Sequence, residues 1–285
     1  MPTAAICSLA DARAAVPAAE LVQTRTWRLR VRVTGAGPDL VLIHGVTDNG
    51  SSWDEVVPAL AAEARVHAID LPGHGLSDIP SRPLRVEEMA AAVGDYLDAA
   101  GVGPCVVAGN SLGGGVALML AAREPERVRA AVSICSLGLP FPMPAGLGML
   151  RLPGVASLMP AVSFRRRLRR TIMRDTFHRG FVPSEAAMER YWEGWRVLGR
   201  PPYVRDLLRA LDRAEPAPVL AGLRMPVHVV HGDEDRVIPV RVGREIAAAI
   251  PGARLTVLPR IGHEPQLEAP AATIAVLRDA LAALR

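Results

Sequence analysis

Hydrophobic and polar positions alternate between two patterns along most of the chain. Short apolar runs rich in Val, Leu and Ile predict β-strands, and longer Ala-rich runs predict helices. The predicted strands are residues 28–33, 40–43, 66–71, 105–108, 128–135, 227–231 and 254–258. The predicted helices are residues 54–64, 86–100, 112–123, 240–249 and 271–284. This alternation indicates an α/β fold with a mostly parallel sheet between layers of helices.

Residues 137–210 interrupt the alternation. Their first part is apolar but broken by Pro and Gly, and it is followed by the basic stretch SFRRRLRRTIMR and the aromatic ERYWEGW. Because the alternation resumes afterwards, we interpret this segment as an insertion between two strands of one sheet. The core is then formed by residues 27–136 and 211–285, and residues 1–26 are predicted to be a loose N-terminal extension.

The composition is typical of a globular protein, with 22% charged residues and half of the 285 residues hydrophobic. All 33 basic residues are arginine, which excludes chemistry that needs a lysine amine, such as a Schiff base or the lysine of a P-loop. The three cysteines, Cys7, Cys105 and Cys135, are widely spaced and odd in number. Two of them fall in apolar strand-like runs, so we interpret them as small buried hydrophobic residues.

The formal charge of +4 is unevenly distributed. Residues 137–210 hold 13 arginines and 5 acids, a balance of +8, whereas the remainder holds 20 arginines and 24 acids, a balance of −4. One hypothesis is that a cluster in the insertion draws anionic substrates or an acidic carrier toward the pocket; the alternative is a solvated helix face. The cluster consists of Arg165, Arg166, Arg167, Arg169 and Arg170.

Several classes of partner find no support in the sequence. Pro and Gly interrupt the longest apolar stretch, so no membrane span is predicted. No basic residue precedes Arg13, which is untypical of a signal peptide, and we expect a cytoplasmic protein. No metal-binding His or Cys spacing and no dinucleotide fingerprint is visible, so no metal or cofactor is expected. We expect a monomer or homodimer that binds a small molecule and no nucleic acid.

The strongest chemical signal is Gly109-Asn110-Ser111-Leu112-Gly113, between a predicted strand and a predicted helix. A nucleophilic serine on a sharp strand-to-helix turn needs this context, because small neighbours relieve crowding there. The strand over residues 40–43 ends in His44-Gly45-Val46, where a backbone N–H can turn toward a developing oxyanion. We therefore predict Ser111 as nucleophile and the N–H groups of Val46 and Leu112 as an oxyanion hole. His44 itself is interpreted as a structural residue.

A general base is predicted at His263, in the loop between the last strand and the last helix. This loop reaches the same edge of the sheet as Ser111. His231 ends a strand near that edge, but we expect its side chain to be buried. The remaining candidates lack a matching loop; they are His67, His178 and His228.

The acid that orients the histidine is expected after a late strand, in the chain order serine, acid, histidine. His231-Gly232-Asp233-Glu234-Asp235 supplies two candidates. We favour Asp235 and interpret Asp233 as a residue that stabilises the loop. An alternative position after the strand near Cys135 is excluded, because residues 136–174 contain no Asp or Glu.

These motifs closely resemble the α/β-hydrolase superfamily, specifically its lidded ester and carbon–carbon bond hydrolases. The resemblance covers about residues 27–284, through HGVTDNGSSW, DLPGHGLSD, GNSLGG, GDEDRVIP and GHEPQLEAP. It implies an eight-stranded, mainly parallel sheet, a helical cap at residues 137–210, and Ser111, Asp235 and His263 as the triad. It also implies that His74 is structural.

Serine at position 111 implies attack on an acyl carbon, whereas epoxide hydrolases and haloalkane dehalogenases of this superfamily carry aspartate there. A carboxylic ester or lactone hydrolase is therefore our first hypothesis. Carbon–carbon hydrolysis of ring-fission diketones is the second, although Val46-Thr47-Asp48-Asn49 and Glu264 differ from those enzymes. Further alternatives are haloperoxidase-like chemistry and non-hydrolytic use of the fold as a receptor or cyclase.

The insertion is expected to set specificity through apolar side chains that wall a pocket for a mainly apolar substrate. The principal candidates for substrate binding are Phe141, Met143, Trp192 and Trp195. Further candidates are Leu147, Met149 and Tyr191. For each of them, plain packing of the insertion against the core is the alternative interpretation.

Overall fold

The computed structural model describes most of the predicted core and parts of the insertion. The described residues are 19–137, 148, 152, 155, 170–171, 173–197, 203, 205–208 and 219–284, without the side chains of 192–197. All structural statements below concern these residues.

An eight-stranded sheet forms the centre of the molecule, with the strand order β1-β2-β4-β3-β5-β6-β7-β8. The strands are β1 Glu20–Gln23, β2 Arg28–Thr34, β3 Asp39–Ile43, β4 Arg65–Ile69, β5 Cys105–Asn110, β6 Val128–Ile134, β7 Val227–Gly232 and β8 Arg254–Leu258. β2 pairs antiparallel with β1 and β4, and all other neighbours pair parallel. The predicted mainly parallel eight-stranded sheet is confirmed.

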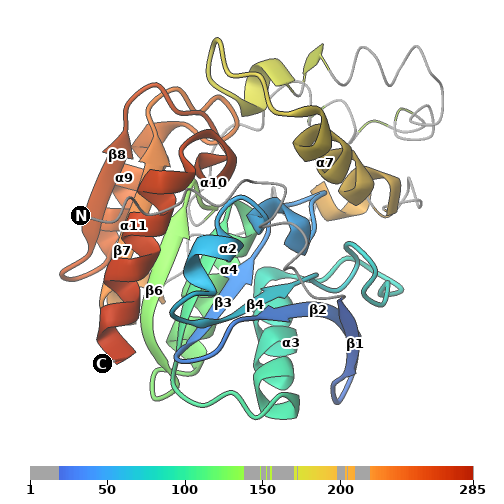
Figure 1. Ribbon diagram of the computed structural model, residues 1–285, viewed down its shortest axis with the longest axis vertical. Coiled ribbons are helices and arrows are strands. Elements are labelled where there is room, and N and C mark those ends of the chain that lie inside the picture. The colour runs from blue at the N-terminus through green and yellow to red at the C-terminus, as the bar shows by residue number, and fades with distance from the viewer. Residues whose placement is uncertain are drawn as a thin grey trace, which may run out of the picture.

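Helices cover both faces of this sheet (Figure 1). The helices are α2 Val57–Leu60, α3 Val86–Ala99, α4 Leu112–Arg123, α7 Glu185–Val197, α9 Val240–Ala249, α10 Pro265–Glu268 and α11 Pro270–Leu281. The short 3-10 helices are η1 Gly50–Trp53, η3 Leu220–Gly222 and η4 Ala282–Leu284. Since side chains alternate along a strand, β3 packs Val41 and Ile43 into the core beneath α3, α4 and α9 and Leu40 and Leu42 into the core beneath α2 and α11.

Two predictions differ from the structure. The segment expected as a loose extension, residues 1–26, contributes β1, which pairs with β2 at the edge of the sheet. Its pattern is weak because three of its four residues are exposed, so no alternation of apolar and polar positions marks it. Of the predicted helix over residues 54–64, only α2 forms, with turns on either side of it.

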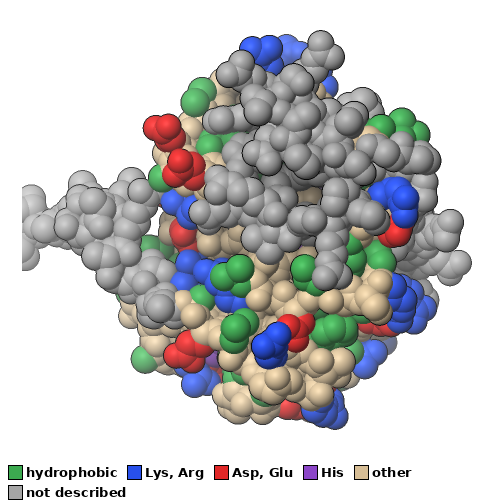
Figure 2. All heavy atoms as spheres, turned by 90° about the vertical axis from the view of Figure 1, so that its right-hand side faces the viewer, with side chains coloured by type: hydrophobic (Ala, Val, Ile, Leu, Met, Phe, Trp, Pro, Cys, Tyr) green, Lys and Arg blue, Asp and Glu red, His purple; other side chains and the backbone are tan. Residues whose placement is uncertain are grey.

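The carboxyl ends of the parallel strands bring the loops after β3, β5, β7 and β8 to one edge of the sheet. Helix α7, from the predicted insertion, stands apart from the helices that flank the sheet (Figure 1). It is joined to the core by Arg190, whose guanidinium lies 2.7 Å from the Glu55 carboxylate and 3.3 Å from that of Asp54. Figure 2 shows side chains of both charges interspersed among hydrophobic ones on one face of the described surface.

Two sequence interpretations can be compared with side-chain burial. Cys105 and Cys135 are buried and free, as expected for small hydrophobic residues. Within the described part of the chain, no helix has the length and apolar character needed to cross a membrane.

Candidate active site

Ser111 sits on a sharp turn between β5 and α4, with a backbone φ of 55° and ψ of −117°. A residue other than glycine rarely adopts such a positive φ, so this turn is strained. It is possible only because its neighbours are small: a Cβ at Gly109 would lie 2.1 Å from the Gly113 oxygen, and a Cβ at Gly113 would lie 2.2 Å from the Ile43 oxygen. The geometry matches the predicted elbow.

The loop after β3 packs directly against this turn. A Cβ at Gly45 would lie 3.2 Å from the Ser111 Cβ, so glycine allows the close approach. The backbone N–H groups of Val46 and Leu112 have no hydrogen-bond partner among the described residues. Leu112 is the first residue of α4, where helix geometry leaves the N–H unpaired. Among the described residues, neither predicted oxyanion donor is engaged in a hydrogen bond.

The predicted acid and base are joined. The Nδ1 of His263 lies 2.8 Å from the Oδ2 of Asp235. The other oxygen of Asp235 accepts hydrogen bonds from the N–H groups of Val237 at 2.8 Å and Ile238 at 2.9 Å. These bonds hold the carboxylate toward the histidine and leave the Nε2 of His263 as the ring nitrogen that can take a proton.

The environment of Asp235 favours its ionised form, although the side chain is fully buried. Burial by itself would raise the pKa of this carboxyl. The positive charge of His263 and hydrogen bonds from His231 and His263 outweigh it and hold the pKa well below the usual range. A buried carboxylate of this kind can stabilise a positive charge on the histidine.

A hydrogen bond also links the serine turn to the histidine loop. The side-chain Nδ2 of Asn110 donates to the backbone oxygen of His263 at 2.9 Å. Ser111 and His263 are both almost fully buried, at 5% and 4% exposure. Ser111, Asp235 and His263, which are 124 and 28 residues apart along the chain, thus lie on adjoining loops at one edge of the sheet.

The other histidines considered from the sequence occupy different settings. His67 lies between Asp39 at 2.9 Å and Tyr96 at 2.7 Å, on the interior of the sheet. His228 contacts Thr256 Oγ1 at 2.8 Å. His178 contacts Glu268 at 2.8 Å. None of these bonds involves Ser111 or Asp235.

The rejected acid candidate has a local role. Asp233 Oδ1 accepts a hydrogen bond from the backbone N–H of Arg260 at 2.6 Å, which joins the loops after β7 and β8. This is the loop-stabilising role expected for it.

His44 and His74 are buried and structural, as interpreted from the sequence. His44 accepts a hydrogen bond at Nε2 from Leu71 N–H at 3.0 Å and contacts the Gly45 oxygen through Nδ1 at 2.7 Å. Burial lowers the pKa of His44 to about 4 and that of His74 to about 3. Both imidazoles are therefore neutral near pH 7.

Sequence reasoning missed Glu268, although it lies in the quoted motif GHEPQLEAP. Its carboxylate accepts hydrogen bonds from the N–H groups on both sides of His263, namely Gly262 at 2.9 Å and Glu264 at 3.0 Å. It also accepts from the N–H and the Nδ1 of His178, both at 2.8 Å. The N–H of His263 donates to the Thr176 oxygen at 2.6 Å. The histidine loop is thus attached to residues of the predicted insertion.

Two further buried carboxyls lie in the loops of the site. Burial raises the pKa of Asp48 to about 7. Burial, together with the nearby Asp48 and Glu268 charges, raises the pKa of Glu264 well above its usual range. Position 264 therefore carries a buried acid with a raised pKa directly after the predicted base.

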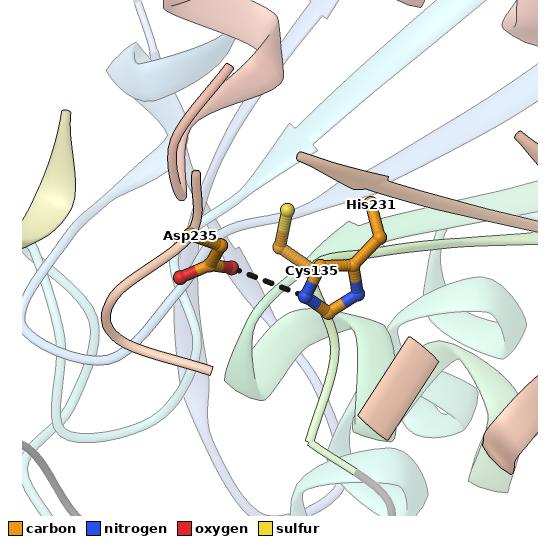
Figure 3. Close-up of side chains that lie close together, drawn as sticks. All are labelled: Cys135, His231 and Asp235. Atoms are coloured by element: carbon orange, nitrogen blue, oxygen red, sulfur yellow. Dashed lines mark ion pairs between the residues drawn. The ribbon is translucent and has the colours of Figure 1, made fainter. Parts of the chain in front are cut away.

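One group of side chains has donor atoms close enough together to consider a metal ion. Cys135, His231 and Asp235 have ligand atoms within 4.8 Å of one another (Figure 3). However, both oxygens of Asp235 already accept hydrogen bonds, and the Nε2 of His231 lies 2.8 Å from the Ile238 carbonyl. Burial also raises the pKa of the Cys135 thiol, which disfavours the thiolate that a metal requires. The arrangement does not fit a metal ion.

The predicted pocket residues cannot be compared with the structure. Phe141 and Met143 lie outside the described residues, and Trp192 and Trp195 belong to α7, where only the backbone is described. Of the basic cluster, Arg165, Arg166, Arg167 and Arg169 lie outside as well.

The fold agrees with comparisons to known proteins. The alpha/beta hydrolase fold family matches residues 38–270, and the chain belongs to this family. It is 31% identical over 261 residues to a pimeloyl-[acyl-carrier protein] methyl ester esterase of Neisseria meningitidis, covering 90% of this chain and 98% of that protein.

A second relative is a 2-hydroxymuconate semialdehyde hydrolase of Pseudomonas sp., 34% identical over 271 residues and covering 90% of each chain. The crystal structure of the enol-lactonase from Burkholderia xenovorans LB400 superposes with a TM-score of 0.75, at 24% identity, over 93% of this chain and all of that chain. At this identity the likeness shows the fold alone. The family and the hydrolase relatives together make this chain a hydrolase enzyme.

Proposed function

We propose that the protein is a serine hydrolase that cleaves a small-molecule carboxylic ester or lactone through an acyl-enzyme on Ser111. The observation that carries this proposal is the buried Asp235–His263 hydrogen bond of 2.8 Å beside the strained Ser111 turn. A serine nucleophile needs a base, and a base needs an orienting acid. The three groups follow in the chain order of the fold family.

In the proposed reaction, Ser111 Oγ attacks the acyl carbon and its proton passes to Nε2 of His263. The N–H groups of Val46 and Leu112 stabilise the oxyanion, and the partial positive charge at the start of α4 adds to this. The tetrahedral intermediate collapses, and the leaving alkoxide takes the proton from His263. Water then attacks the acyl-enzyme with His263 as base, which releases the acid and restores Ser111.

For the substrate, we propose a mainly apolar acyl group, bound beneath a cap formed by residues 137–210. The candidate wall residues remain Phe141, Met143, Trp192 and Trp195. The relative named as a methyl ester esterase supports an ester as substrate. The acyl-carrier protein in its name supports the hypothesis that the arginine cluster of the insertion draws an acidic carrier toward the pocket. We further propose a cytoplasmic enzyme that acts as a monomer or homodimer.

The proposal predicts that Ser111→Ala abolishes turnover of short p-nitrophenyl esters and labelling by a fluorophosphonate probe. Ser133→Ala is the matched control, because Ser133 is also fully buried and its hydroxyl has no partner among the described residues. We expect the control to keep full activity. Circular dichroism should show an unchanged fold in both variants. Full activity in Ser111→Ala, or an unlabelled native protein, would contradict the proposal.

Carbon–carbon bond hydrolysis is the second candidate function. The 34% identity to the 2-hydroxymuconate semialdehyde hydrolase favours it. The buried Glu264 disfavours it, since the ring-fission hydrolases that the elbow resembles carry an aromatic residue there. Measuring kcat/KM for a ring-fission diketone beside an ester and a lactone decides between them. A higher value for the diketone, abolished by Ser111→Ala, would favour this second function.

A further inference from the structure

We propose that His231 is a positioning residue of the site, which donates a hydrogen bond toward Asp235 and fixes the loop that carries this acid. The inference rests on the proposed function, since it assigns a role within that site. His231 is separate from the proposed triad of Ser111, Asp235 and His263.

The contacts of the His231 ring identify one nitrogen as a donor. His231 lies in β7 and is fully buried. Its Nε2 lies 2.8 Å from the Ile238 carbonyl oxygen and 3.3 Å from Oδ2 of Asp235 (Figure 3). A carbonyl oxygen only accepts hydrogen bonds, so Nε2 must carry a proton. One N–H shared by two acceptors is a three-centre bond.

The other ring nitrogen of His231, Nδ1, has no acceptor for a hydrogen bond among the described residues. Nδ1 is buried and has no hydrogen-bond partner in the described part of the chain. A Cβ at Gly243 of α9 would lie only 2.4 Å from it, so the ring packs directly against the helix. A proton on Nδ1 would be buried without an acceptor, which costs free energy. The geometry therefore assigns His231 the neutral tautomer with the proton on Nε2.

Glycine at position 243 allows the His231 ring to lie directly against helix α9. Inside a helix, Gly is less favourable than Ala, so its presence calls for a structural reason. Here the missing side chain makes the space that the imidazole occupies. The helix thus holds the ring against the acid loop.

The acid loop is held at several points, and His231 contributes to two of them. Ile238 donates its N–H to Oδ1 of Asp235 at 2.9 Å, and its carbonyl accepts from His231 at 2.8 Å. Oδ2 of Asp235 faces both His231 and His263. Loss of His231 would leave a carbonyl unpaired and the carboxylate with one donor fewer.

This arrangement affects the base through electrostatics. A hydrogen bond from His231 offsets part of the negative charge of Asp235, so His263 experiences less of it. The other titratable groups around Asp235 are Cys135 and Glu264. Burial raises the pKa of both above their usual values, and it raises the pKa of Asp48, which lies near Glu264, to about 7. These groups are the same in every variant, so a difference in the pH profile between variants reports on His231.

The test compares the pH dependence of kcat/KM for an ester in three variants. In His231→Leu, which lacks the donor, we expect the acidic limb to move up by about half a pH unit and kcat to fall about tenfold, as the acid loop loosens. In His231→Gln, the amide N–H can reach the position of Nε2, so the wild-type profile should return. His228→Leu is the control, because His228 lies on the same strand and contacts Thr256 instead.

The inference would be overturned if the acidic limb of the pH profile lay at the same pH in His231→Leu and His228→Leu. A shift that His231→Gln does not reverse would overturn it as well. If His231→Leu does not fold, Gly243→Ala displaces the ring without removing it and should move the limb in the same direction. No shift in that variant would also overturn the inference.

A second measurement separates this inference from the proposed function. Nitrogen-15 NMR of histidine-labelled protein reads the protonated nitrogen of His231 without any substrate, with His231→Gln to assign the signal. A proton on Nε2 supports the inference and a proton on Nδ1 overturns it. A wild-type protein that neither turns over esters nor reacts with the probe would instead contradict the proposed function, and the NMR result would still decide the inference.

Discussion

The loops after β3 and β4 hold two buried histidines near Asp70, and the end of β7 with the loops after β7 and β8 holds two near Asp235. Only in the second pair of loops does the aspartate contact the histidines. In the first pair, here the early loops, the rings of His44 and His74 lie 5.2 Å apart. Asp70 accepts instead from the backbone N–H groups of Gly50 at 2.7 Å and Leu76 at 3.0 Å, and from the guanidinium of Arg30 at 3.3 Å. None of its hydrogen bonds in the described residues comes from a histidine.

In the second pair, here the late loops, Asp235 contacts both His231 and His263. Burial without a carboxylate contact leaves the early histidines neutral, with pKa values of about 4 for His44 and about 3 for His74. Contact with two imidazoles keeps the buried Asp235 ionised. The same residue types therefore build a rigid turn in one place and an acid–base pair in the other. The difference lies in which groups the carboxylate touches.

The largest expected effect is a difference in kcat between the variants of Asp235 and Asp70. Asp235→Asn should lower kcat about 10⁴-fold, because an amide removes the charge and favours the wrong tautomer of His263. Asp70→Asn should leave kcat within a few-fold and lower the free energy of unfolding by about 2 kcal/mol, since the amide N–H₂ faces backbone donors. Ester turnover and urea denaturation of both variants check this. A similar loss of kcat in both would remove the distinction between the early and late loops.

Asp48→Asn, in the early loops, should raise the free energy of unfolding, whereas Asp70→Asn should lower it. The pKa of Asp48 is raised to about 7, so the folded state binds its proton more tightly than the unfolded state and stability falls as pH rises from about 4 to 7. Asp48→Asn keeps the neutral form at every pH. We expect it to be more stable than wild type by about 4 kcal/mol at pH 8 and nearly equal to it near pH 4.

Urea denaturation at several pH values measures this difference. Asp279→Asn is the control, since Asp279 is half exposed in a surface ion pair with Arg254, and such pairs contribute little. A gap between Asp48→Asn and wild type that does not grow with pH would show that Asp48 is ionised in the folded protein.

The smallest expected effect concerns His74, whose pKa is lowered to about 3. Because the unfolded state takes up this proton more readily, the wild type loses stability as pH falls below about 6.5. His74→Met removes this loss, so the variant should gain about 2 kcal/mol relative to wild type between pH 7 and pH 5, with kcat little changed. Thermal unfolding at the two pH values checks it. A pH-independent difference would mean that burial does not control this histidine.

Much of the fold could be predicted because its elements are strongly patterned. The predicted helices 112–123 and 240–249 coincide with α4 and α9, and the predicted strand 254–258 coincides with β8. β1 was missed, since an exposed edge strand buries too little to require an apolar pattern. The helix over residues 54–64 is shortened to α2, because the residues before and after it form turns, such as the bond from Val56 N–H to the Trp53 oxygen at 2.9 Å.

The chain alone specifies a serine in a glycine-rich turn, two aspartates after one strand and a histidine after the next. The serine turn is local, because small neighbours are what permit the backbone of Ser111. The contact of Asp235 with His263, which the sequence favoured over one with Asp233, and the approach of His231 to the same carboxylate arise in the folded molecule. Those contacts join loops from separate strands, and their electrostatics depend on distances that spacing along the chain does not set.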